Sequence, residues 1–129
     1  MQFASDRQFR LWDYNVSHKQ LLIRSPASPD VAGNIDLVFW QVEAVALPTE
    51  FDGIDLAFST PKEREWLEQM TGKSVSSTLF CLKTKMRRSF VCAGGFKVLS
   101  NELDICESTL VYFGIERPIE WYGKVIAHS

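Results

Sequence analysis

The sequence predicts an α+β fold that is predominantly antiparallel β: a sandwich or a partly open barrel of about eight to ten strands, with one short helix at about residues 61–70. Two observations lead to this prediction. Short β-like runs bounded by turn residues recur along almost the whole chain. One segment alone, residues 60–72, carries helix start and stop signals together.

The helix signals are specific. Thr60 suits an N-cap, Pro61 suits the first helical position, and Glu63 completes a capping box with Thr60. Gly72 suits the left-handed position just past the end. These signals predict a helix that begins and ends sharply within a chain of strands.

The expected helix has a narrow apolar stripe formed by Trp66, Leu67 and Met70. A stripe of this width packs on one surface only, so the helix is expected to lie against the sheet as a lid or brace. If Trp66 docks the helix, its truncation to alanine would cost about 3 kcal/mol or more of stability.

Alternating and apolar runs predict the strands. The run 35–47 is apolar on both faces, which is typical of a central strand, and it is expected to bend near Gln41 or to break in two. Gly94-Gly95 predicts a bulge or tight bend. Strands are expected at residues 9–14, 20–24, 35–47, 53–58, 78–84, 89–98, 103–106, 110–113 and 119–127.

The segments 78–84 and 89–98 form the strongest hairpin candidate, with residues 85–88 as the loop. This loop would place Cys81 opposite Cys92, and the sequence leaves open whether the two thiols pair. Cys106 is the third cysteine, and no Cys-x-x-Cys pair occurs.

Bulk properties bound the class of protein. A chain of 129 residues with 46% hydrophobic and 23% charged residues fits a single folded domain, residues 1–129. Neither a signal-like segment at residues 1–7 nor an apolar run of membrane-spanning length is visible, so we expect a cytoplasmic protein and no membrane association. The net charge of −2 argues against nonspecific nucleic-acid binding.

No catalytic, cofactor-binding or metal site is predicted. The two histidines, His18 and His128, lie in a turn and next to the last residue, where no triad is indicated. The cysteines and histidines lack metal-ligand spacing. Gly94-Gly95 is not followed by the residues of a phosphate loop. These absences favour a protein that is not an enzyme, although carboxylates and tyrosines could also do chemistry.

Two features indicate a surface for partners. Basic residues gather at the expected hairpin tip, and an aromatic pair is expected to share one strand face with Arg10. The candidate partner surface is therefore Lys83, Lys85, Arg87 and Arg88 together with Trp12 and Tyr14.

The first hypothesis is a small cytoplasmic binding protein without catalysis, whose partner is an unknown protein. Immunity proteins that neutralise toxins, and adaptor proteins, are similar in size and build, but shape alone assigns no function. One alternative is a small-ligand protein or enzyme with its pocket inside a β-barrel, lined by Tyr14, Tyr112 or Tyr122. Another is RNA binding through the basic tip, residues 83–88. Unpaired strand edges would also allow a homodimer.

Overall fold

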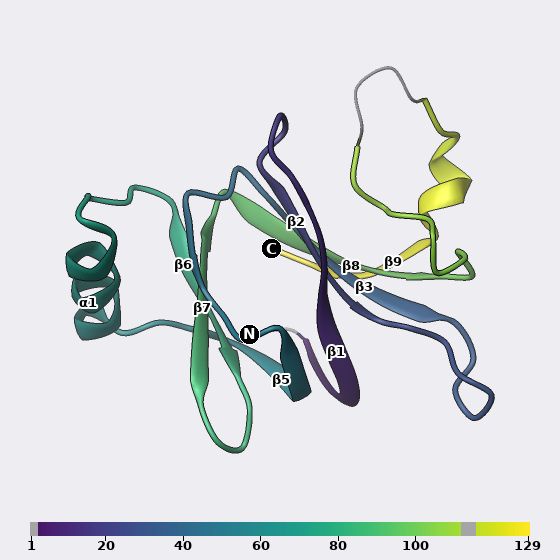
Figure 1. The fold of residues 1–129 in the computed structure, drawn as a ribbon, viewed down its shortest axis with the longest axis horizontal. Coiled ribbons are helices and arrows are strands. Elements are labelled where there is room, and N and C mark those ends of the chain that lie inside the picture. The colour runs from purple at the N-terminus through teal and green to yellow at the C-terminus, as the bar shows by residue number, and fades with distance from the viewer. Residues whose placement is uncertain (1–2, 112–115) are drawn as a thin grey trace.

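The computed structural model describes residues 3–111 and 116–129, and within them antiparallel strands dominate, as the sequence predicts (Figure 1). Nine strands form one sheet in the order β4-β7-β6-β5-β1-β2-β3-β8-β9. The strands are β1 (Ala4–Asn15), β2 (Gln20–Ser25), β3 (Asn34–Trp40), β4 (Ala44–Ala46), β5 (Glu50–Phe58), β6 (Thr78–Lys83), β7 (Arg88–Ala93), β8 (Gly95–Asn101) and β9 (Lys124–His128). The helices are α1 (Pro61–Thr71) and the short 3-10 helix η1 (Ile119–Tyr122).

The sheet closes into a barrel because two of its long strands are bent. β3 continues through a kink into β4, and β7 continues through a kink into β8. The two bent strands pair with each other on both sides of the kinks, from Trp40 opposite Gly95 to Ala44 opposite Cys92. β3 also pairs with β2 and β7 with β6, so six long strands form a ring. Of the two predicted architectures, the structure is the barrel.

The side chains of Gln41 and Trp40 lie close against the backbone at the kinks, which explains the glycine pair. A Cβ atom on Gly94 would lie 2.5 Å from Oε1 of Gln41, and one on Gly95 would lie 2.3 Å from Cζ2 of Trp40. Gln41 itself takes a left-handed φ of 52°. The predicted break near Gln41 and the predicted bend at Gly94-Gly95 are therefore both confirmed, and they are two sides of one junction.

Apolar side chains fill the barrel interior. Phe80 packs against Phe39 and Phe96, with ring centroids 5.7 Å and 5.4 Å apart. The same cluster includes buried residues from seven strands, from Phe9 in β1 to Val98 in β8. Its burial supplies the main hydrophobic stabilisation of the fold.

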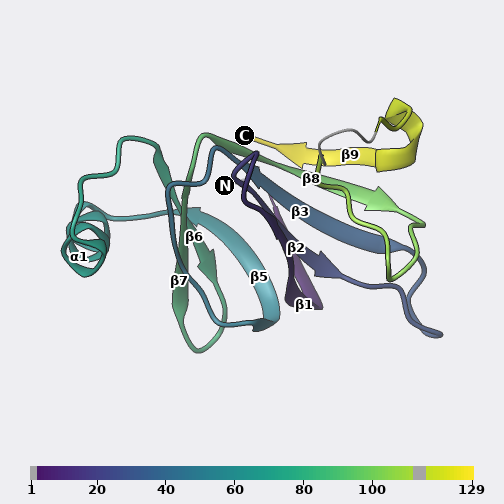
Figure 2. The ribbon, with the colours of Figure 1, turned by 45° about the horizontal axis from the view of Figure 1, so that its top comes forward.

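Two separate layers cover the outside of the barrel at its opposite ends (Figure 2). At one end, α1 packs over β6 and β7 around Leu67 and Cys92. At the other end, the chain that follows β8 packs over β2, β3 and β8 around Leu22 and Leu110. We call the described part of this second cover, residues 102–111 and 116–123, the strap.

The helix begins and ends where the sequence predicts. The Thr60 hydroxyl accepts a hydrogen bond from the Glu63 N–H, the Glu63 carboxylate accepts one from the Thr60 N–H, and Gly72 has a φ of 75°. The orientation of its apolar stripe differs from the expectation. Leu67 is fully buried, whereas Trp66 is 49% exposed and Met70 is 52% exposed. Leu67 is therefore the fully buried docking residue of the helix, and Trp66 adds a half-buried contact with Phe90.

The hairpin of β6 and β7 forms, but its turn comes one residue earlier than predicted. The Thr84 hydroxyl accepts hydrogen bonds from the N–H groups of Met86 and Arg87, which fixes the turn at residues 84–87. The pairing is consequently shifted, and Cys81 lies opposite Phe90. The predicted register, with Cys81 directly opposite Cys92, is therefore wrong.

After β8 the chain departs from the three predicted strands. Residues 103–106 form a turn in which Asp104 accepts a hydrogen bond from the Cys106 N–H. The predicted strand 119–127 divides into η1 and β9, because Gly123 passes so close to Ser100 that a Cβ atom would lie 2.2 Å from its carbonyl oxygen. Of the predicted strand 110–113, residues 110 and 111 are not in a strand, and residues 112 and 113 lie outside the described residues.

Burial predicts which helix residue matters most for stability. Leu67→Ala is expected to lower the free energy of unfolding by about 3 kcal/mol, because it leaves a cavity in a fully packed site. Trp66→Ala is expected to cost less than half as much, because half of its surface is already in water. Urea unfolding of both variants tests this order, and a larger loss for Trp66→Ala would contradict it.

Candidate functional site

The structure separates the residues of the expected partner surface. Lys83, Lys85 and Arg87 lie exposed at the β6–β7 tip. They border two adjoining surface grooves of about 540 and 280 Å³, whose other wall comes from β1 and β5. That wall carries carboxylates, Asp52 and Asp55 among them, so the tip does not form a uniformly positive surface.

Trp12 and Tyr14 do not share a face. The pairing of β1 with β2 shifts between Leu11 and Asp13, which leaves Trp12 on the outside of the barrel, 5.2 Å from the guanidinium of Arg24. Beyond this bulge Tyr14 pairs with Leu21, a residue of the barrel interior, and cross-strand partners share a face. The expected aromatic pair is therefore wrong, because a bulge reverses the alternation of side chains.

Arg88 belongs to the helix rather than to the basic tip. Its Nε donates to Oε2 of Glu63 at 2.6 Å, and its Nη2 donates to Oε1 of Glu63 at 2.9 Å. The pair thus joins the first turn of α1 to the start of β7 in a bidentate geometry. Hydrogen bonds from Arg88 hold the pKa of the Glu63 carboxyl below its ordinary value, and the same contacts raise the pKa of Arg88.

Further polar contacts fix the other end of α1 and the loop that follows it. Arg64 donates to the carbonyl oxygens of Val75 and Ser77, and the Glu68 carboxylate accepts from the Val75 N–H. Glu43, just before β4, accepts from the N–H of Ser77 at 2.7 Å. Hydrogen bonds from Ser77 hold the pKa of the Glu43 carboxyl below its ordinary value. The charged side chains of Arg64 and Glu68 thus hold the helix against the loop that follows it.

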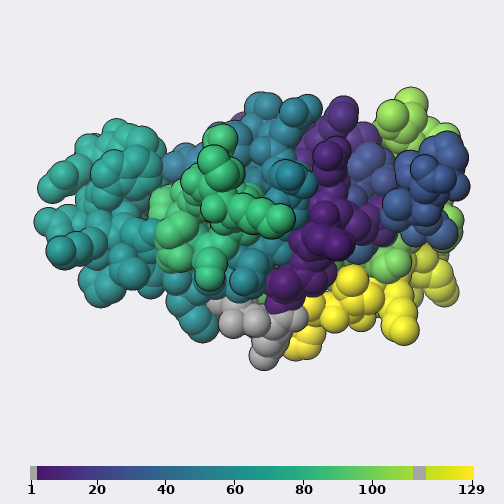
Figure 3. Space-filling model, turned by 90° about the horizontal axis from the view of Figure 1, so that it is seen from below, coloured from purple at the N-terminus to yellow at the C-terminus, as the bar shows by residue number. Residues whose placement is uncertain are grey.

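The remaining residues of the helix form an exposed surface, which we call the α1 face. It consists of Lys62, Glu65, Trp66, Gln69 and Met70. Their spacing of three and four residues places them side by side on one side of the helix. In the space-filling view α1 lies in the lobe at one end of the molecule (Figure 3). The α1 face thus carries an exposed tryptophan and an exposed methionine, and Phe58 is exposed just before the helix.

A groove of about 350 Å³ lies between α1 and β7 beside this surface, and we call it the Trp66 groove. Phe90 packs against the Trp66 indole, with the ring centroids 5.9 Å apart. The Trp66 groove is lined by Lys62, Glu63, Trp66, Arg88 and Phe90. Apolar rings, two cationic side chains and the Glu63 carboxylate therefore meet in one shallow, open site. Sequence reasoning found Arg88 and Trp66 separately, but it had no signal that Phe90 and the helix would bring them together.

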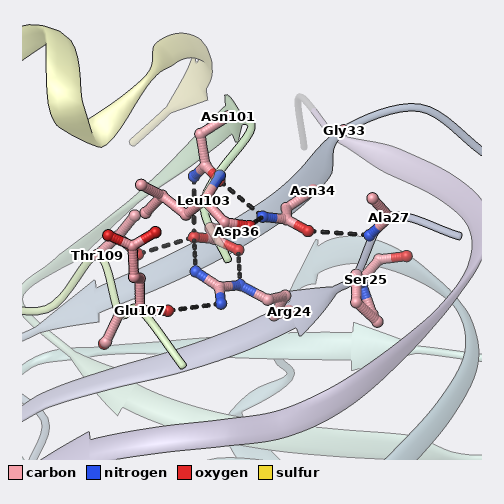
Figure 4. A network of polar contacts seen from close by, with 12 residues as sticks. Arg24, Ser25, Ala27, Gly33, Asn34, Asp36, Asn101, Leu103, Glu107 and Thr109 are labelled. Atoms are coloured by element: carbon pink, nitrogen blue, oxygen red, sulfur yellow. Dashed lines mark hydrogen bonds and ion pairs between the residues drawn. The ribbon is translucent and has the colours of Figure 1, made fainter. Parts of the chain in front are cut away.

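The most buried polar cluster lies at the other end of the barrel (Figure 4). Arg24 in β2 and Asp36 in β3 are cross-strand partners, and they form a bidentate pair at 2.6 and 2.8 Å with side chains at most 1% exposed. Asp36 also accepts hydrogen bonds from Asn101 and Thr109. Arg24 donates a third hydrogen bond to the carbonyl oxygen of Glu107.

This cluster is structural. Every buried side-chain polar atom in the described residues has a hydrogen-bond partner, and none of the groups in the pair is open to solvent. Its contacts from Thr109 and to Glu107 fasten the strap to the barrel. The sequence carried a signal for the pair that we did not use: two opposite charges, each inside an apolar strand run, in strands of one hairpin.

The thiols give no chemistry to this site. Cys81, Cys92 and Cys106 are all free, which answers the question of a Cys81–Cys92 bond for this structure. Burial raises the pKa of the Cys81 and Cys92 thiols, which makes them poor nucleophiles. No group of three or more possible metal-binding side chains occurs among residues 3–111 and 116–129.

Comparison of the chain with protein-family models, with curated proteins and with solved structures gives no match. In the described parts of the chain, no helix is long and apolar enough to cross a membrane.

The buried pair predicts a non-additive mutant cycle. Asp36→Leu and Arg24→Met should each cost about 3–5 kcal/mol, because each leaves an uncompensated buried charge. The double variant Arg24→Met with Asp36→Leu should cost less than either single change. Urea unfolding of the three variants measures this, and costs that simply add would show that the two charges do not depend on each other.

The docking of α1 should depend on pH through Glu63. Because its pKa is lowered in the folded state, its contribution to stability is present above the ordinary value of 4.5 and is lost as the pH falls through the lower folded value. Glu63→Gln keeps a capping side chain but removes the charge. The stability gap between the wild type and Glu63→Gln should therefore be larger at pH 7 than at pH 3.

Glu65→Gln is the matched control, because Glu65 is an exposed carboxylate on the same helix. Its stability gap to the wild type should stay small at both pH values. A Glu63→Gln gap that does not change with pH would contradict the role of the Glu63–Arg88 pair.

Proposed function

We propose that this chain is a non-catalytic protein-binding module of the cytoplasm, and that its partner contacts the α1 face. The observation that carries the proposal is Trp66, which is half exposed although its helix is fixed to the barrel by Leu67 and by the Glu63–Arg88 pair. Tryptophan and arginine are over-represented among the residues that dominate binding energy at interfaces. A rigid anchor also loses little conformational entropy on binding.

The alternatives have weaker support. A ligand pocket inside the barrel competes with the aromatic side chains that pack there, and Tyr122, which belongs to the strap, packs against the outer cluster. Tyr112 lies outside the described residues. RNA binding through the tip is disfavoured by Asp52 and Asp55, which face the same groove as Lys83 and Lys85.

Surface occlusion is the mechanism that this proposal implies. The partner would cover Trp66 and Met70, and the binding energy would come mainly from their burial. A homodimer remains an alternative, because β4 and β9 stand at the two ends of the strand order and Val125 in β9 is half exposed.

The test begins with the full chain as bait in a lysate of its native host, with cross-linking and mass spectrometry to identify the partner. The purified partner is then titrated against the wild type and two variants. Trp66→Ser should weaken binding by about tenfold or more. Val125→Ser, a matched loss of an exposed apolar side chain at the far end of the molecule, should leave the affinity unchanged.

Two results would overturn the proposal. One is a partner whose affinity is insensitive to Trp66→Ser but sensitive to Val125→Ser, which would move the interface to β9. The other is a chain that binds only itself, with a dimer that Trp66→Ser leaves intact.

A further inference from the structure

We propose that the Trp66 groove binds an acidic, apolar segment of the partner protein; this rests on the proposed function and names the chemistry that the α1 face recognises. Some donors and apolar rings of the groove make no hydrogen bond or full contact within the protein, and they are therefore available to a partner.

Both oxygens of the groove's carboxylate accept hydrogen bonds within the protein. Oε1 of Glu63 accepts from the Thr60 N–H and from Arg88, and Oε2 accepts from Arg88. These contacts satisfy its negative charge within the protein. Glu63 is therefore a positioning residue for Arg88, and it adds little attraction for a cationic ligand.

The cations of the groove keep donors free. Arg88 uses Nε and Nη2, while Nη1 has no hydrogen-bond partner among the described residues. The Lys62 side chain makes no hydrogen bond or ion pair with any residue that the structure describes. With Glu63 counted, the groove lining carries a net charge of +1, and the unused groups of Lys62 and Arg88 are donors.

The apolar part of the groove has its own requirement. The Trp66 and Phe90 rings form a shelf that would bury an aliphatic or aromatic side chain, while Lys62 and Arg88 meet a carboxylate beside it. An acidic segment with a large apolar residue satisfies both requirements. A basic segment would place like charges together.

The experiment uses two acetylated, amidated hexapeptides as probes. Each has leucine and phenylalanine at its centre, flanked on both sides by two glutamates in one peptide and by two lysines in the other. Each is titrated into the ¹⁵N-labelled full chain and followed by NMR. The glutamate peptide should shift the indole N–H of Trp66 and the amides of Lys62 and Arg88, and the lysine peptide should not.

Charge variants test the same inference. Lys62→Glu should weaken binding of the glutamate peptide by about tenfold. Lys73→Glu is the matched control, because Lys73 is exposed, lies just past the helix and does not line the groove. It should change the affinity by less than about twofold, which is the effect of net charge alone at moderate salt.

Three outcomes would overturn this inference: equal binding of both peptides, shifts that map to the β6–β7 tip, or no shift at millimolar glutamate peptide. Shifts of the Trp66 signals on concentrating the chain without peptide would instead assign the groove to a second copy. If an identified partner needs Trp66 while the glutamate peptide does not bind, only the acidic chemistry fails. If the peptide binds but the partner ignores Trp66→Ser, the proposed function fails.

Discussion

The fold depends on how closely two chain segments pass at one junction. Gly94 and Gly95 lie against the side chains of Gln41 and Trp40, which a Cβ atom on either glycine would displace, and both strands turn there. This junction lets β3 and β4 keep pairing with β8 and β7 after the bend, so the six long strands close into a ring instead of spreading as an open sheet. The ring in turn creates one packed interior and an outer surface that needs separate covers.

Different interactions hold the strap and the helix α1 against the barrel. The strap is fastened by a dry, fully satisfied ion pair, in which Asp36 and Arg24 each reach a strap residue. Such a pair adds little net stability over an apolar equivalent, but breaking it is costly, so it specifies where the strap lies. The helix is fastened by one buried leucine and by partly exposed polar contacts, among them the Glu63–Arg88 pair. This leaves Trp66 and Met70 outside, and the proposed function uses that exposure.

Local signals made the helix and most strands predictable. Thr60, Pro61, Glu63 and Gly72 fix both helix ends through contacts within one or two turns, and such contacts are readable from sequence. The candidate site was not readable in the same way. Which side of the helix faces the barrel depends on Phe90 and Leu67 meeting across the fold. One extra residue in β1 forms a bulge, which places the Tyr14 side chain on the other face. This bulge could not be predicted because it has no distinctive sequence signal.

The central claim is that α1 presents a half-exposed tryptophan from a rigid frame. ¹⁵N relaxation of the Trp66 indole N–H measures this most directly, because an exposed ring is mobile unless the frame holds it. The account predicts an order parameter of about 0.85 for Trp66, as for the barrel backbone, and a lower value in Glu63→Gln. An order parameter below about 0.6 in the wild type would contradict it.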